Sequence, residues 1–180
     1  MKIERERVRE TFREYTDAYD ATDEKIKLKI DHTYRVAELC ERIAKAEQME
    51  KTEVDLAWLL GMLHDVGRFE QLRRYGTFSD ADSIDHAALG ADILFGGPLS
   101  AGKGLIRTYV DDAAEDEVIE TAIRVPTGFR RGLRRARKSC AISCGTPTRS
   151  IFCRSMWMCR WRRFTIPRRR NCATQPSHRQ

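Results

Sequence analysis

The chain of 180 residues is 41% hydrophobic and carries a formal net charge of +6, which suits one domain with an apolar core and requires no second one. The charge is unevenly divided, because residues 1–123 contain 17 lysines and arginines against 27 acidic residues, whereas the remainder contains 16 basic residues and no acidic one. The sequence has neither an apolar run of about 18 residues nor the apolar segment of a signal peptide, so it predicts no transmembrane segment and a cytoplasmic location.

The first predicted helix lies near the N-terminus, where apolar residues recur among charged ones. Val8, Phe12, Tyr15 and Tyr19 follow one another at three- to four-residue steps. This spacing is typical of an amphipathic helix that buries one stripe. We expect this helix to be structural.

A second helix is predicted to begin near Thr22 or Asp23, both of which are good N-cap residues, and to continue to about Met49. Its apolar face is wide. His32 lies on that face, so it is a candidate either for a buried structural histidine or for a ligand.

The third predicted helix is apolar almost all round and ends at His64. Thr52, with Asp55 three residues later, resembles a capping box that begins this helix. The polar and aromatic connection that follows, residues 67–83, has the length of a short helix joined to a functional loop.

Three shorter helices are predicted after this connection. Ser83 is the expected N-cap of the first, which carries His86 and stops at the Gly-Gly-Pro of residues 96–98. The other two are expected around residues 105–110 and 115–123. No alternation of period two is long enough for a sheet, so the predicted fold class is all-α.

The helical pattern stops after Arg124, where glycines and prolines interrupt the sequence. We therefore predict a domain of residues 1–124 followed by an irregular basic segment, residues 125–180. Its arginines, with Trp157 and Trp161, predict nonspecific binding of nucleic acid or other polyanions. The abrupt change to arginine-rich sequence without acidic residues leads to the hypothesis of a shift of reading frame near Arg124, which translation of the coding DNA in the other two frames would test. The competing hypothesis is that polyanion binding by this segment is a selected function.

The most informative feature is the adjacent pair His64 and Asp65 at the end of an apolar helix. Consecutive helical side chains point about 100° apart, but both can reach one ion where a helix ends, and we expect Gly67 to give the backbone that freedom. Together with His32, these donors favour Mn, Fe, Co, Ni or Zn over Mg. Such an ion polarises a phosphoryl oxygen and lowers the pKa of bound water.

These residues resemble a known family. The order of His32 and then His64-Asp65 is similar to the signature of the HD superfamily of metal-dependent phosphohydrolases. The segment GMLHDVGRFEQLRRYGTFSDADSIDHAALGADIL, residues 61–94, resembles bacterial members beyond that pair, and the resemblance covers most of residues 20–123. It implies an HD-type helical bundle in which His32, His64 and Asp65 bind a divalent metal and a nucleotide or another small phosphate ester is hydrolysed.

The same resemblance implies further roles. Asp65 would orient or bridge during catalysis, and Arg68 matches a basic position that can hold a phosphate oxygen. The alternative for Arg68 is a solvated arginine at a helix end. His86 matches a histidine that some members use for a second metal or for the substrate phosphate, and its alternative is a residue of a surface helix.

The chain also departs from the family, whose members use a later aspartate as the last metal ligand. No acidic residue follows Glu120, and Asp111, Asp112 and Asp116 do not lie in the expected sequence context. We therefore expect a site without its fourth protein ligand, which weakens metal affinity although water can take the vacant position.

This departure leads to two further expectations. Without the family's later helices, apolar surface over Leu63 and Val66 is expected to be uncovered. The alternative to an active phosphohydrolase is a catalytically inactive metal- or nucleotide-binding remnant with a polyanion-binding basic segment.

Overall fold

The computed structural model describes residues 2–102 and 104–124, and within them every regular element is a helix, so the predicted all-α fold class is confirmed. None of these helices is long and apolar enough to cross a membrane. The basic segment and the boundary predicted at residue 124 lie outside the described residues. In chain order the helices are α1 (Arg5–Asp17), α2 (Glu24–Ala46), α3 (Lys51–Leu63), α4 (Val66–Tyr75), α5 (His86–Phe95), α6 (Ile106–Tyr109) and α7 (Asp116–Arg124).

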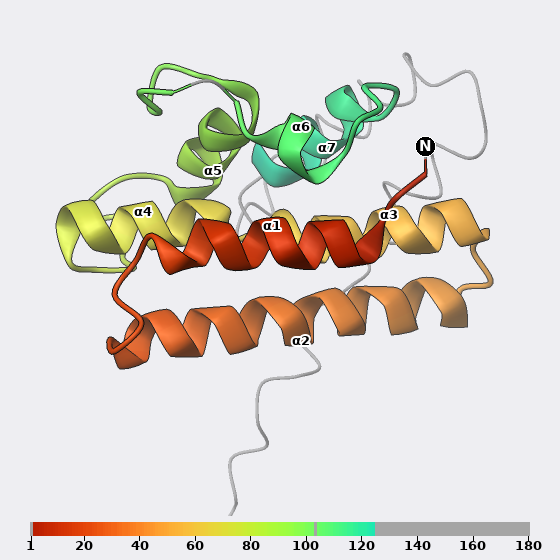
Figure 1. Cartoon of the computed structure of the whole chain (residues 1–180), viewed down its shortest axis with the longest axis horizontal. Coiled ribbons are helices and arrows are strands. Elements are labelled where there is room, and N and C mark those ends of the chain that lie inside the picture. The colour runs from red at the N-terminus through yellow and green to blue at the C-terminus, as the bar shows by residue number, and fades with distance from the viewer. Residues whose placement is uncertain (1, 103, 125–180) are drawn as a thin grey trace, which may run out of the picture.

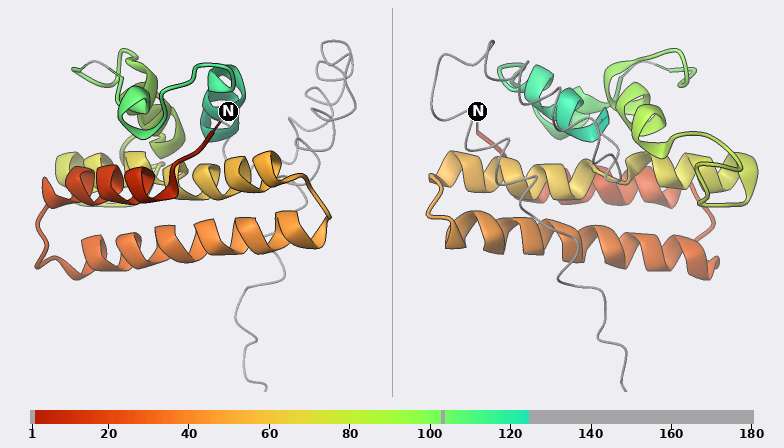
Figure 2. Two further views of the ribbon diagram at one scale, coloured as in Figure 1. Left: turned by 45° about the vertical axis from the view of Figure 1, so that its right-hand side comes forward. Right: turned by 180° about the vertical axis from the view of Figure 1, so that it is seen from behind.

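The helices form three rough layers (Figure 1). Helix α2 lies on one side of α1 and α3, and α5, α6 and α7 lie on the other side. Helices α3 and α4 follow each other end to end, which is clearest from behind (Figure 2). The most extensive packing joins α2 to α3 and α4 to α5, so the junction of α3 with α4 lies where both pairs meet.

The core begins with the predicted stripe of the first helix. Val8 and Phe12 have no exposed surface. The ring of Phe12 packs edge-on against Tyr34 of α2 and Phe69 of α4, with ring centroids 5.6 and 5.9 Å apart. Helix α1 therefore ties α2 to α4 through aromatic contacts.

The predicted start of the second helix is confirmed at one of its two candidate residues. Asp23 is the N-cap of α2, and its carboxylate accepts a hydrogen bond of 2.7 Å from the backbone N–H of Lys25. The helix ends at Ala46, three residues before the predicted end near Met49.

The capping box predicted for the third helix is wrong by two residues. Glu50 is the N-cap of α3, and its carboxylate and that of Glu53 each accept from the other's backbone N–H. Asp55 instead accepts from Arg5 of α1 at 2.7 Å. Asp55, which the sequence pattern had placed in the capping box, thus forms an ion pair with Arg5 instead.

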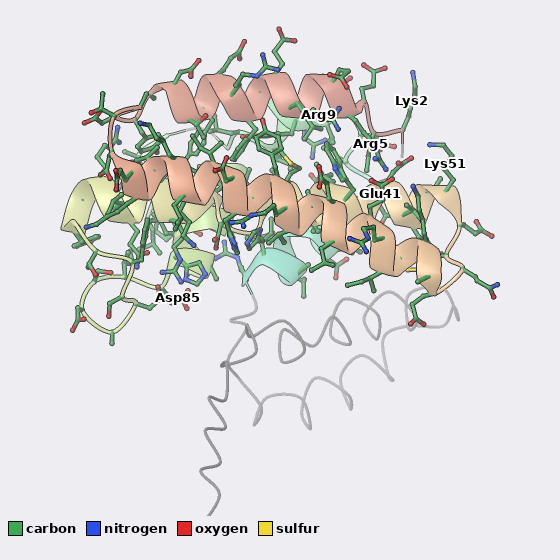
Figure 3. All side chains as sticks on the ribbon, turned by 90° about the horizontal axis from the view of Figure 1, so that it is seen from below. Lys2, Arg5, Arg9, Glu41, Lys51 and Asp85 are labelled. Carbon is green, nitrogen blue, oxygen red and sulfur yellow. The ribbon has the colours of Figure 1, made fainter. Side chains whose placement is uncertain are left out.

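The N-cap predicted for the fifth helix is also wrong. Asp85, not Ser83, caps α5, and its carboxylate accepts from the backbone N–H groups of Ala87 and Ala88. Ser83 donates its hydroxyl to the carbonyl of Ser79 and so stabilises the preceding loop. Figure 3 shows Asp85 where that loop reaches α5.

The short helix and loop predicted after the third helix correspond to α4 and residues 76–85. Gly67 lies in the first turn of α4, so the prediction that it loosens the chain is wrong. The glycine allows a close approach instead, because a Cβ at this position would lie 2.1 Å from the carbonyl oxygen of His86. Gly67 therefore lets α5 pack directly on α4.

The expectation of uncovered apolar surface over Leu63 and Val66 is wrong, since both residues are fully buried. Tyr15 of α1 donates its hydroxyl to the carbonyl of Val66 at 3.0 Å, and α7 packs against α3. Helix α1 therefore covers Val66 at the junction of α3 and α4, and α7 covers part of α3.

Candidate metal centre

The break between α3 and α4 presents His64 and Asp65 to the neighbouring helix α2. Helix α3 ends at Leu63, and Asp65 leaves helical geometry with φ of −110° and ψ of 14° before α4 begins. This short break changes the direction of the two consecutive side chains. One donor atom from each, together with one from His32 of α2, lies within 4.8 Å of the other two.

The shared point of this group is one oxygen of Asp65. Its Oδ2 lies 3.5 Å from Nε2 of His32 and 3.4 Å from Nε2 of His64. The two imidazole rings have centroids 5.4 Å apart. The three side chains predicted as metal ligands are therefore brought together by α2 and by the junction of α3 with α4.

The hydrogen bond made by Nδ1 of His64 determines which nitrogen of this ring is free to bind an ion. Nδ1 lies 2.7 Å from the carbonyl oxygen of Gly61, which can only accept, so Nδ1 carries the proton. The lone pair of Nε2 is then available. Nε2 is buried, has no hydrogen-bond partner and is directed toward the carboxylate of Asp65. A lone pair beside a carboxylate is unfavourable unless a cation lies between them.

The protonation states of the other two members also suit a cation. Burial opposes ionisation of Asp65, but the polar and positively charged groups beside it, Lys29 among them, outweigh burial, so the pKa of this carboxyl lies well below its ordinary value. Burial, with the nearby His64 and Lys29, lowers the pKa of His32 to about 4. At neutral pH the group therefore offers an ionised carboxylate and a neutral imidazole.

Two further side chains face the other oxygen of Asp65. Nε of Arg68 lies 3.9 Å and Nε2 of His86 lies 3.8 Å from Oδ1. Their side chains are 15% and 12% exposed, so neither is a solvated surface residue. Arg68 comes from α4 and His86 from the start of α5.

Arg68 is held by several hydrogen bonds, but its buried Nε–H is unused. Its Nη1 donates to the side chain of Gln71, to the carbonyl oxygen of Phe78 and to Oδ1 of Asp80 at 2.5 to 2.7 Å. Its Nε is buried without a hydrogen-bond partner. An N–H group that has no partner and lies beside candidate metal ligands is suited to donate a hydrogen bond to an anion.

Asp80 was not identified from the sequence, although it holds three residues near the site. Besides Arg68, its carboxylate accepts from Nε2 of Gln71 at 3.0 Å and from Nδ1 of His86 at 2.8 Å. The Nδ1–H bond leaves Nε2 of His86 directed toward Asp65. With Asp85 and His86, Asp80 forms a second group whose donor atoms lie close together.

Replacing Asp80 with alanine is expected to loosen the loop of residues 76–85. The change removes charge-assisted hydrogen bonds from α4 and α5 to the loop, and their loss is expected to make chymotrypsin cleave after Phe78 roughly tenfold faster. Limited proteolysis followed by mass spectrometry measures this rate. Asp82→Ala, an exposed position in the same loop, is the matched control. Equal rates for the two variants would contradict the role of Asp80.

Lys29 is the second residue that was not identified from the sequence. Its Nζ lies 2.7 Å from Oδ2 of Asp65, and its side chain is 16% exposed. One available signal was its spacing, because Lys29 precedes His32 by three residues and therefore shares its face of α2. The side chain adds a positive charge beside the candidate metal ligands.

The aspartates considered as a replacement fourth ligand are engaged elsewhere. Asp111 forms an ion pair with Arg7, and Asp116 forms one with Arg107. Asp112 accepts from the backbone N–H of Ala114. Within the described residues, none of them belongs to the group formed by His32, His64 and Asp65.

These features define a helical domain with a group of two histidines and one aspartate that is suited to a divalent metal. The sequence profile of the HD domain family matches residues 30–130, and the chain belongs to this family. The resemblance predicted from the sequence is therefore confirmed. A comparison with curated proteins and one with solved structures each find no match.

Family membership suggests a metal-dependent phosphohydrolase, because HD domains bind divalent metals. The residues present fit such an ion. The donor set is of nitrogen and carboxylate type, and the buried Nε2 of His64 lacks a partner that a cation would provide.

Proposed function

We propose that the chain is a metal-dependent phosphohydrolase that acts on a nucleotide or another small phosphate ester. One observation supports this most directly: two buried atoms without hydrogen-bond partners lie beside Asp65. Nε2 of His64 is an unused acceptor, which suits a cation, and Nε of Arg68 is an unused donor, which suits an anion. A divalent metal together with a phosphate group would satisfy both.

Each residue has a role in this proposal. His32, His64 and Asp65 would hold the cation, which in the bound state polarises a phosphoryl oxygen and lowers the pKa of coordinated water. Of the metals of this class, Mn, Fe, Co, Ni or Zn fit these donors better than Mg. Asp65 stays ionised and orients the neighbouring groups.

The residues on the other side of Asp65 would bind the substrate. Arg68 would donate Nε–H to a phosphoryl oxygen and stabilise the charge that develops there. His86, held through Nδ1 by Asp80, would present Nε2 to a second metal or to the same phosphate. Asp65 and Arg68 are thus the proposed catalytic residues.

The proposal is tested by metal content and by hydrolysis. Purified protein is expected to contain nearly stoichiometric Mn, Fe, Co, Ni or Zn, and His64→Ala is expected to lose it, because this change removes the unpartnered Nε2. Elemental analysis measures this loss. A hydrolysis screen over phosphate monoesters and diesters, supplemented with each metal, then identifies the substrate class.

The control for that screen is the double variant His64→Ala, Asp65→Ala, with circular dichroism to confirm that it folds. Activity that persists in this variant belongs to another site or to a contaminant and contradicts the proposal. Binding of metal without hydrolysis of any ester supports the alternative of an inactive binding module.

A further inference from the structure

Lys29 of α2 places a positive charge on the carboxylate that the proposed metal ligands share. Its Nζ lies 2.7 Å from Oδ2 of Asp65, the oxygen that also lies within 3.5 Å of His32 and His64. No other cationic side chain approaches this oxygen so closely within the described residues. The ammonium therefore competes with a metal for the same carboxylate oxygen.

This arrangement lowers the affinity for a divalent cation that binds without an anion. A divalent cation held by His32, His64 and Asp65 would place two positive charges next to the ammonium of Lys29. The side chains of Lys29 and Asp65 are only 16% and 6% exposed, so water screens the repulsion poorly. The lysine also neutralises the only carboxylate of the group.

A bound anion would offset the repulsion between the cation and Lys29. Arg68 and His86 face the other oxygen of Asp65 at 3.9 and 3.8 Å, and Nε of Arg68 has no partner. A phosphate bound beside them could also accept from Lys29. While it pairs with Asp65, the ammonium also lies 5.2 Å from the ring centroid of Phe78, whose carbonyl oxygen accepts from Arg68.

We propose that Lys29 binds the phosphate of the substrate and thereby couples phosphate binding to metal binding. Without phosphate, Lys29 occupies the carboxylate of Asp65 and weakens binding of the cation. With phosphate, the ammonium pairs with the anion and Asp65 becomes available. Because coupling between two ligands is reciprocal, each should increase affinity for the other. This inference rests on the proposed function.

The experiment titrates Mn²⁺ into the full metal-free chain by isothermal calorimetry, with and without inorganic phosphate. For the wild type, phosphate is expected to raise the Mn²⁺ affinity at least about fivefold. For Lys29→Met, Mn²⁺ alone is expected to bind about tenfold more tightly than to the wild type, because the competing ammonium is absent. The effect of phosphate in this variant is expected to fall below about twofold.

Two matched variants test whether the effect of Lys29→Met comes from the lost charge or from a change in structure. Lys27→Met removes an exposed lysine from the same helix and is expected to behave as the wild type. Lys29→Arg keeps the charge and is expected to retain the phosphate effect. Circular dichroism checks that each variant folds, and the wild-type titration decides the coupling even if Lys29→Met does not fold.

The outcomes distinguish this inference from the proposed function. Mn²⁺ binding by the wild type without a phosphate effect overturns the coupling but leaves the metal site intact. The same holds if Lys29→Met binds Mn²⁺ more weakly than the wild type, which would mean that Lys29 only positions Asp65. Failure of the wild type to bind Mn²⁺ under either condition contradicts the proposed function itself.

Discussion

Replacing Gly61 with alanine is expected to lower the free energy of unfolding by about 3 kcal/mol and to weaken binding of the divalent metal. A Cβ on Gly61 would lie 2.5 Å from Cα and 2.9 Å from the backbone nitrogen of Ala37 in α2. Both are backbone atoms, so a rotamer change cannot relieve the clash. Helix α2 must instead move away from α3.

That movement would affect the proposed metal centre, because its candidate ligands come from both helices. His32 lies on α2 and His64 follows α3, and the carbonyl of Gly61 is the acceptor that fixes the ring of His64. Separation of the helices would increase the distance of 3.5 Å between His32 and Asp65. Stability and metal affinity should therefore fall together.

Urea denaturation in the presence of EDTA measures the change in stability without a contribution from bound metal. Calorimetric titration with Mn²⁺ measures the change in affinity. The control is Gly102→Ala, where a Cβ meets nothing within 4 Å and both quantities should stay unchanged. A Gly61→Ala variant with wild-type stability would show that the contact between α2 and α3 can relax.

Most of the helices could be predicted because their apolar residues repeat at helical spacing. Helix boundaries were less predictable, since a cap depends on which polar side chain is free to reach the backbone. Asp23 was predicted as an N-cap because its side chain is short and well suited to that position. Glu50 was missed because glutamate is not a favoured N-cap, while Thr52 and Asp55 imitated the pattern.

The candidate site was predictable only in part. The pair His64 and Asp65 is visible as adjacent residues, and the resemblance to a family linked it to His32. Lys29 and Asp80 carry no motif of their own. Asp80 lies on a loop 12 residues from Arg68, and its contacts depend on how that loop folds over α4 and α5. Tertiary packing, rather than spacing, determines such contacts.

The burial of Leu63 and Val66 is another feature that local sequence could not predict. The expectation of an uncovered surface came from the absence of the family's later helices. Instead, Tyr15 of α1 contacts the backbone of Val66, and α7 packs on α3. When helices distant in sequence bury a residue, the residues next to it in the chain give no sign of this burial.

Replacing Gly67 with alanine is expected to cost about 3 kcal/mol of stability, but through a different pair of helices. A Cβ at this position would lie 2.1 Å from the carbonyl oxygen of His86 and 2.6 Å from the backbone nitrogen of Gly90. Helix α5 must then move away from α4. His86 should be displaced from Asp65, whereas His32 and His64, which α5 does not carry, should keep their places.

The expected result is a separation of effects between the two glycine variants. In folded protein, Gly67→Ala should bind Mn²⁺ with nearly wild-type affinity while Gly61→Ala should not, because the extensive contact of α2 with α3 joins the proposed metal ligands. Gly90→Ala provides a graded comparison, since its Cβ would approach Gly67 only to 3.0 Å and should cost about 1 kcal/mol. Urea denaturation and Mn²⁺ titration on all three variants measure both quantities. Equal loss of metal affinity in Gly61→Ala and Gly67→Ala would mean that α5 also supports the metal ligands.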